Sequence, residues 1–168
     1  MTTKPTLHFL CGKLASGKTT LARQIATENH AILISEDIWL SKLFPGEISS
    51  LSDYINYSSR FRNAIAPHAE SLLRHGMSVV FDFAGNVPKH RSWVRSIFES
   101  ADADHLLHYI IASDTLCKAQ LRIRNELKPE GSQYTTEEEF DEITKYFVPP
   151  SSEEGFIVKE YDAERRYW

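Results

Sequence analysis

A glycine-bearing segment at residues 12–19 constrains this chain more than any other feature. It is Gly-Lys-Leu-Ala-Ser-Gly-Lys-Thr, which matches the spacing G-x-x-x-x-G-K-[ST]. A chance match anywhere in a chain of 168 residues has a frequency on the order of 1%. The apolar run at residues 7–11 precedes the segment, and a stretch with helical spacing follows it. The segment therefore predicts a strand, a tight turn and a helix in succession.

This arrangement has a specific physical use. Gly12 and Gly17 would let the backbone curl so that successive N–H groups point inward, and the helix beginning near Lys18 would add the positive end of its dipole. The Lys18 ammonium would reach the β- and γ-phosphates of a nucleotide, and the Thr19 hydroxyl would coordinate Mg²⁺. We therefore predict a nucleotide-phosphate site made of Gly12, Lys13, Leu14, Ala15, Ser16, Gly17, Lys18, Thr19 and Thr20.

Strand-like and helix-like segments alternate along the whole chain. Buried strands are predicted at residues 7–11, 31–35, 78–83, 106–112 and 156–159. Helices are predicted at residues 19–28, 37–44, 52–75, 88–100, 114–127 and 136–146, and Pro67 must kink or split the third of them. The alternation predicts an α/β fold, a parallel five-stranded sheet with helices on both faces. No repeat or linker divides the sequence, so we expect one domain over residues 1–168.

The charge balance gives no general attraction to polyanions. Lys and Arg number 19 and Asp and Glu 23, for a net charge of -4, which disfavours nucleic-acid or membrane binding but leaves room for a local basic cleft. Cys11 and Cys117 have no metal-ligand spacing and are expected to be buried free thiols, and the histidines show no metal-ligand spacing either. Without a signal-like or membrane-spanning apolar stretch, a cytoplasmic location is expected.

Features outside the glycine-bearing segment favour phosphoryl transfer over hydrolysis. The guanine-reading motif N-K-x-D of GTPases does not occur in the sequence. Asp82 lies near the end of the third predicted strand, in VVFDF, where a Walker B aspartate would lie, and the next residue is Phe83 rather than the acidic residue with which many ATPases activate water. An arginine-bearing helix and loop follow the fourth predicted strand, as in the lid of a kinase.

Four segments taken in order carry a family resemblance. They are GKLASGKTT, ISED after the second strand, VVFDF with Arg91 downstream, and LRIRN. In this order the chain resembles the small P-loop kinases, which include polynucleotide kinase, gluconate kinase, chloramphenicol phosphotransferase and zeta toxin, and most of all the bacterial kinases described as AAA-family ATP-binding proteins. The resemblance covers residues 7–159. It implies a P-loop NTPase fold with a small helical lid at about residues 122–147, with ATP and Mg²⁺ as cofactors.

The resemblance also assigns a candidate base. An aspartate after the second strand acts in relatives as the base toward the accepting hydroxyl, and Asp37 holds that place here. Capping of the following helix is the alternative role of Asp37, and Glu36 is a second candidate for the base. Many relatives carry an arginine three residues later, where this chain has Leu40, so recognition of a phosphate on the acceptor is left open.

Further charged residues are candidates by position. Asp82 would hold Mg²⁺ together with Thr19 or orient the acceptor, with a structural hydrogen-bonding role as the alternative. Lid arginines in relatives clamp the transferring phosphoryl group, which makes Arg122 and Arg124 catalytic candidates alongside Lys18 and Asp37. Two residues apart on a helix, Arg122 and Arg124 face different ways, and the sequence leaves open which of them faces the nucleotide.

The acceptor side is less defined by the sequence. Arg60, Arg62 and Arg91 are candidates for the acceptor pocket, with solvated surface charge as the alternative. Four aromatic residues either line that pocket or pack in the core, namely Trp39, Tyr54, Tyr57 and Phe61. In the related fold the segment at residues 148–154 approaches the adenine.

The predicted function is transfer of the γ-phosphate of ATP to a hydroxyl of a small-molecule acceptor. One alternative is a nucleic-acid 5'-end kinase, which would need a local basic groove. Another is a nucleotide-binding regulatory module without transfer activity. The sequence identifies neither the acceptor nor a protein partner.

Overall fold

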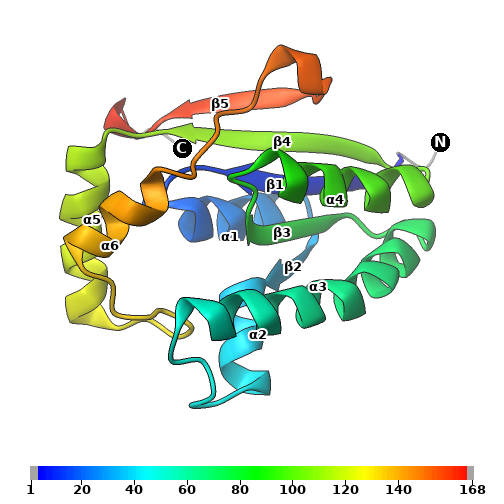
Figure 1. Cartoon of the computed structure of the whole chain (residues 1–168). Helices are drawn as coiled ribbons and strands as arrows, with labels where there is room; N and C mark the ends of the chain where they lie inside the picture. The colour runs from blue at the N-terminus through cyan, green and yellow to red at the C-terminus, as the bar shows by residue number, and fades with distance from the viewer. Residues whose placement is uncertain (1–3, 166–168) are drawn as a thin grey trace.

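The computed structural model describes residues 4–165 and contains one parallel sheet (Figure 1). The strand order is β2-β3-β1-β4-β5, and every neighbouring pair is parallel. The strands are β1 (Thr6–Cys11), β2 (Ile32–Ser35), β3 (Val79–Ala84), β4 (Asp104–Ile111) and β5 (Val158–Asp162). The predicted α/β fold with a five-stranded parallel sheet is confirmed.

Helices cover both faces of the sheet. One face packs against α1 (Lys18–Glu28), α5 (Asp114–Leu127) and α6 (Glu137–Thr144). The other packs against α2 (Glu36–Leu43), α3 (Leu51–Arg74) and α4 (Pro88–Ser100). Two 3-10 turns flank the last strand, at Ser152–Glu154 and Ala163–Arg165. In Figure 1, α3 and α4 run across the front of the sheet while α5 and α6 stand together at one end of it.

The strands divide their side chains between two cores. In β1, Phe9 and Cys11 join the core under α2, α3 and α4, whereas Leu10 joins the core under α1 and α5. This alternation follows from the two-residue period of a strand whose faces are both covered. Cys11 and Cys117 are both buried and free, as predicted.

The helix α3 passes through Pro67 without interruption. It begins at a capping box, in which the Ser50 hydroxyl accepts from the Asp53 N–H and the Asp53 carboxylate accepts from the Ser50 N–H. On either side of the proline, Ile65 and Ala69 are buried against the sheet. Of the predicted kink or split at Pro67, the split does not occur, because packing along one face holds both halves in a single element.

The sheet positions a crevice at the carboxyl ends of its central strands. The strand β1 lies between β3 and β4, and its connection leads across the sheet to β2. In open parallel sheets ligands bind where the chain departs to opposite sides in this way. The loops after β1, β2 and β3 therefore meet at one edge. None of the helices among residues 4–165 is both long and apolar enough to cross a membrane.

Candidate functional site

The loop after β1 has the conformation that the glycine-bearing motif predicts. Gly17 has φ of 103° and Ala15 has φ of 58°, both in the left-handed region. A Cβ on Gly12 would lie 2.7 Å from the Ser16 hydroxyl oxygen and 3.2 Å from the Ile110 Cβ. Side chains at positions 12 and 17 are therefore excluded, by close packing and by backbone conformation respectively. The helix α1 then begins at Lys18 with no side chain capping its first turn, which leaves its N–H groups available to an anion.

Two polar side chains in this loop lack the partner that an anion would supply. The Ser16 hydroxyl is buried and makes no hydrogen bond among the described residues. Among the residues that the structure describes, the Lys18 ammonium bonds only to the carbonyl oxygens of Gly12 at 2.6 Å and Lys13 at 2.8 Å. Burial lowers the pKa of Lys18, although the nearby Asp82 charge acts in the opposite direction. A bound phosphate would complete the coordination of both groups.

Asn86, in the turn after β3, bonds to the loop that follows β1. Its side-chain oxygen accepts the Gly12 N–H at 3.0 Å, and its carbonyl accepts the Val148 N–H at 2.9 Å. Asn86 therefore links the phosphate-binding loop to the segment for which the sequence suggested proximity to adenine. Sequence reasoning missed this residue, because a lone asparagine after a strand carries no motif.

Asp82 and Thr19 lie side by side, as their shared metal assignment requires. The Thr19 hydroxyl donates to Asp82 at 3.3 Å, and the Ser35 hydroxyl donates to the other carboxylate oxygen at 2.9 Å. Hydroxyl and carboxylate oxygens are the ligands that Mg²⁺ prefers in proteins, so the donor set fits that ion. Within residues 4–165 no group of three or more His, Cys, Asp or Glu side chains could hold a metal alone. Phosphate oxygens would have to supply the remaining ligands.

Asp37 lies in the first turn of α2 and is unpaired within the described residues. Ser35 occupies the N-cap position and no side chain caps the helix, so the capping alternative for Asp37 is not what the structure contains. The residue retains solvent-exposed surface, yet protein crowds its carboxyl group. This desolvation, together with the charges of Glu36 and Asp82, raises the pKa of Asp37 to about 6, against the opposing effect of Arg124 and Lys18.

The neighbouring Glu36 is committed to an internal ion pair. It is 1% exposed, and Arg62 contacts both of its carboxylate oxygens, at 2.7 Å and 3.0 Å. The Tyr54 hydroxyl adds a hydrogen bond at 3.2 Å. The Arg62 guanidinium also lies over the rings of Phe83 and Trp93. This enclosure disfavours Glu36 as the base and gives Arg62 a partner close to Asp37.

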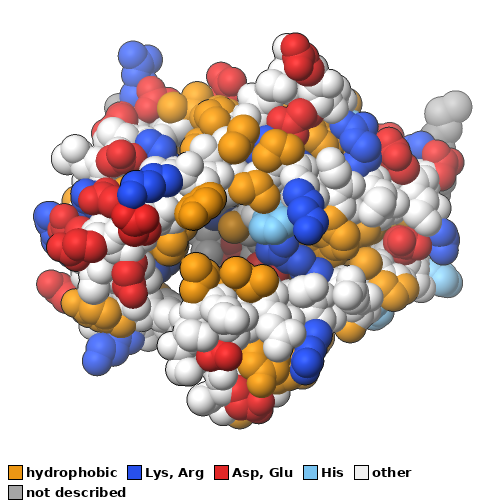
Figure 2. Space-filling view, in the orientation of Figure 1, with side chains coloured by type: hydrophobic (Ala, Val, Ile, Leu, Met, Phe, Trp, Pro, Cys, Tyr) orange, Lys and Arg blue, Asp and Glu red, His pale blue; other side chains and the backbone are white. Residues whose placement is uncertain are grey.

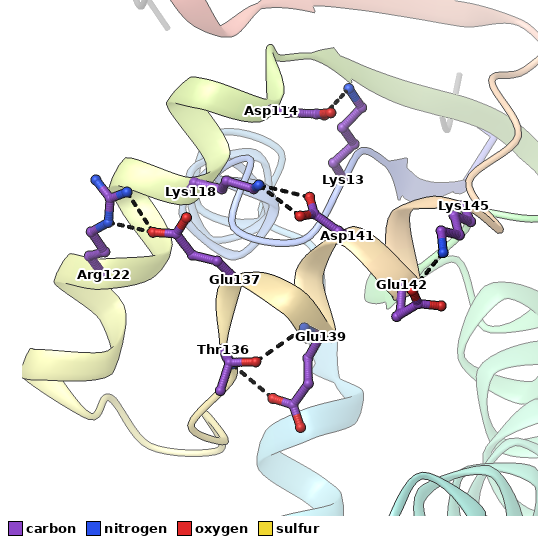
Figure 3. Close-up of polar contacts among 10 residues, drawn as sticks. All are labelled: Lys13, Asp114, Lys118, Arg122, Thr136, Glu137, Glu139, Asp141, Glu142 and Lys145. Atoms are coloured by element: carbon purple, nitrogen blue, oxygen red, sulfur yellow. Dashed lines mark hydrogen bonds and ion pairs between the residues drawn. The ribbon is translucent and has the colours of Figure 1, made fainter.

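The two lid arginines differ in their surroundings. The Arg122 side chain is 65% exposed and pairs with Glu137 of α6 (Figure 3). Arg124 is partly buried, and its Nε atom has no hydrogen-bond partner among residues 4–165. Burial lowers the pKa of Arg124, while the charge of Asp37 raises it. Of the two, Arg124 is therefore the arginine whose charge is felt at the site.

The remaining acceptor candidates, Arg91 and Arg60, have different surroundings in the structure. Arg91 is 0% exposed, contacts both carboxylate oxygens of Glu154 and donates to the carbonyl oxygens of Gly85 and Val148. This placement does not support the prediction that Arg91 lines the acceptor pocket, because its guanidinium already bonds to Glu154 and to two backbone carbonyl oxygens. Arg60 is exposed and lies over the Tyr57 ring at 5.7 Å.

The four aromatic candidates likewise divide between core and surface. Phe61 is buried in the core, and Tyr54 and Tyr57 are partly buried against it. Trp39 is 43% exposed, with its ring 5.7 Å from that of Phe61. Figure 2 shows a hollow near the middle of this face of the molecule, rimmed by hydrophobic side chains with cationic ones along one side.

Comparisons with known proteins place this geometry in a family. The family model for the AAA domain matches residues 7–150. A solved protein described as a kinase, from Chloroflexus aurantiacus, superposes with a TM-score of 0.78 at 18% identity, covering 96% of this chain and 87% of that chain. A gluconokinase from Sinorhizobium meliloti gives a TM-score of 0.60 at 14% identity, covering 94% of this chain and 82% of that chain.

A further solved structure is bound to a nucleotide complex. Kti12 from Chaetomium thermophilum in complex with ADP-AlF3 gives a TM-score of 0.64 at 14% identity, covering 92% of this chain and 89% of that chain. No curated protein sequence matches this chain. The expected resemblance to the small P-loop kinases is confirmed at the level of the fold, and the chain belongs to the AAA domain family.

Proposed function

We propose that this chain transfers the γ-phosphoryl group of ATP to a hydroxyl group of a small-molecule acceptor. The observation that carries the proposal is the position of Asp37. Its carboxyl group, with a pKa raised to about 6, shares one electrostatic neighbourhood with Lys18 of the phosphate-binding loop, with Asp82 and with Arg124. A base, a phosphate-binding cation and a further cation are the groups that phosphoryl transfer requires in one place.

The donor would bind along the loop from Gly12 to Thr20. The free N–H groups of the first turn of α1 and the Lys18 ammonium would bind the phosphates. Thr19 and Asp82 would hold Mg²⁺, whose charge would neutralise phosphate oxygens when bound. Asn86 would keep Gly12 in place through the side-chain hydrogen bond to its N–H.

Asp37 would act on the acceptor. A carboxylate with a pKa of about 6 is mostly ionised at neutral pH, yet it is a stronger base than an ordinary aspartate. It would accept the hydroxyl proton as the phosphoryl group moves. Most of the catalytic effect would come from positioning and from charge stabilisation, as is general for phosphoryl transfer.

Arg124 would stabilise charge on the transferring group. Its Nε atom lacks a hydrogen-bond partner among the described residues while its surroundings are partly buried, an arrangement that an anionic oxygen would satisfy. Arg122 would act on the surface of the lid, where its pairing with Glu137 links α5 to α6. We retain residues 122–147 as the proposed lid.

Small acceptors are favoured over nucleic acid by two observations. The net charge of -4 gives no general attraction to a polyanion. A gluconokinase shares the fold, and its name denotes phosphorylation of a small hydroxyl compound. Arg60 and Arg62 are proposed to border the acceptor, Arg62 through its position beside Glu36 and Asp37.

The test is a transfer screen with γ-labelled ATP and Mg²⁺ against pooled sugars, nucleosides, antibiotics and oligonucleotides. The proposal expects label in a small hydroxyl compound with the wild-type chain and little with Asp37→Asn. Asp102→Asn, at an exposed turn remote from the site, serves as the matched control. Label in oligonucleotides alone would support the nucleic-acid alternative instead. Tight ATP binding with no labelled acceptor would support the regulatory alternative.

A further inference from the structure

The loop between α5 and α6 packs directly onto the backbone that carries Asp37. Gly131 in this loop has φ of 79°, and a Cβ added there would lie 2.9 Å from the Asp37 carbonyl carbon. The same Cβ would lie 3.0 Å from the Asp37 carbonyl oxygen and 3.0 Å from the Ile38 nitrogen. The glycine therefore faces the peptide group that joins Asp37 to Ile38, at a distance that admits no side chain.

Contacts at the base and at the tip hold this loop in place. At the base, the Asn125 side chain donates to the Thr135 carbonyl at 2.7 Å and accepts the Thr135 N–H at 3.2 Å. At the tip, Glu130 pairs with Lys42 of α2 at 3.3 Å, but both side chains are more than 60% exposed and so add little stability. The contact of Gly131 with α2 is therefore a closely packed connection between the loop and the helix.

We propose that Gly131 is a positioning residue. Its contact with the Asp37–Ile38 peptide docks the loop between α5 and α6, called the lid loop below, onto α2 and fixes the position of the proposed base. The inference rests on the proposed role of Asp37. Docking would bring the part of the site that holds Asp37 and the part that holds Arg124 together in one step. Docking places Gly131 against the helix turn that holds the base, while the same loop follows the helix that holds Arg124.

The contact also bears on the environment of Asp37. Desolvation is the largest cause of its raised pKa, and the charged groups that act on it are Glu36, Asp82, Arg124 and Lys18. None of those four lies in the loop, and Arg124 belongs to α5, which is anchored by the buried Cys117 and Leu121. Because the loop packs against the backbone of this turn, we expect its displacement to loosen the packing around Asp37 while leaving the charged neighbours in place, and so to lower the pKa of Asp37.

The chain supplies a matched control for the substitution. Gly76 has φ of 81°, nearly that of Gly131, but nothing lies within 4 Å of a Cβ added there. Gly76→Ala therefore imposes the same kind of backbone strain without the collision. Comparing Gly131→Ala with Gly76→Ala separates the contact with Asp37 from the general cost of alanine at positive φ.

The experiment is a carboxyl ¹³C NMR titration of the full chain, with the Asp37 signal assigned by its loss in Asp37→Asn. Gly131→Ala should lower the pKa of Asp37 by about one pH unit, the size of a partial loss of desolvation. Gly76→Ala should leave it unchanged. Equal pKa values of Asp37 in both variants and the wild type would overturn the inference.

A second variant keeps the inference testable if Gly131→Ala does not fold. Asn125→Ala removes both hydrogen bonds at the base of the loop, and should shift the pKa of Asp37 in the same direction. Hydrogen exchange should then rise in residues 36–40 as well as in the loop, whereas a purely local effect would leave residues 36–40 unchanged and contradict the inference. Neither measurement uses an acceptor, so a failed transfer screen would overturn the proposed function without deciding this contact.

Discussion

The two halves of the proposed site are built differently. On the donor half, the Lys18 ammonium bonds to carbonyl oxygens only six and five positions away in the sequence. On the acceptor half, Glu36 is paired with Arg62, 26 positions away, and the backbone of Asp37 lies against Gly131 from a loop beyond the fourth strand. The loop that carries Lys18 is thus closed by local bonds, although Asp82 and Asn86 reach it from β3 and the turn after β3, whereas the acceptor half depends on the assembly of distant segments.

This difference separates phosphate binding, which is the same for any acceptor, from recognition of one particular acceptor. A compact loop that binds phosphate serves any acceptor, and many functions share it. The surroundings of Asp37 include α2, α3 and the lid loop, so changes in those three elements would alter the acceptor with little effect on the donor. The variants below test this division, beginning with the largest expected effect.

Lys18→Ala should have the largest effect, because it removes the partly buried cation of the donor half. Transfer should fall by about 1000-fold, the upper range for removing one group that stabilises developing charge. Arg23→Ala removes an exposed cation from the same helix and should change transfer little. Single-turnover rates with γ-labelled ATP make the comparison, and unchanged transfer in Lys18→Ala would contradict the donor assignment.

Asp37→Asn should act on the acceptor half alone. Transfer should fall by at least about 100-fold, the usual scale for removing a general base, while the affinity for ATP stays within a few-fold of wild type. Rates and nucleotide affinities measured on the same preparation check both parts. Transfer within a few-fold of wild type would exclude Asp37 as the base.

Arg124→Ala and Arg122→Ala should differ in their effect on phosphoryl transfer, although the two residues are only two positions apart. Loss of a charge-assisted hydrogen bond from Arg124 should lower transfer by about 10- to 100-fold. Arg122→Ala breaks only an exposed pair with Glu137 and should change transfer less than twofold, on the order of the small value of surface pairs. Equal losses in the two variants would show that the lid arginines are not divided as proposed.

The smallest expected effect is on stability. Asp37 has an ordinary pKa of 3.8 and a folded pKa of about 6, so its ionised form is disfavoured in the folded chain. Its cost is absent below the ordinary pKa of 3.8, grows as the pH rises from there to about 6, and is fully present above that. Asp37→Asn should therefore raise Tm by a few degrees at pH 8 and by less at pH 5. A gain that is larger at pH 5 would contradict the raised pKa.

Local patterns in the sequence were sufficient to predict much of this molecule. The spacing of Gly12, Gly17 and Lys18 predicted the phosphate-binding loop, and alternating apolar runs predicted all five strands. These features depend on residues close in the sequence, where backbone conformation and side-chain period act directly. Asp37 follows the second strand, as expected, whereas Asp82 lies within β3, two residues before its end.

Long-range contacts could not be predicted in this way. Arg91 was a candidate for binding an acceptor, but it pairs with Glu154, 63 positions away, in a buried structural contact. The asparagine that holds Gly12 is 74 positions from it. No single-sequence pattern links such residues, because each pairing arises only when the sheet brings their loops together. The role of an arginine therefore has to be judged from its burial and its partners.

The most direct test of the central claim is a calorimetric titration of the wild-type chain with a non-hydrolysable Mg²⁺–ATP analogue, repeated with Lys18→Ala. The account predicts one saturable site in the wild-type chain and a loss of affinity of at least about tenfold in the variant, as expected for removing a charged hydrogen-bonding partner. An absence of binding heat in the wild-type chain at several temperatures, or equal affinities in the two proteins, would contradict it.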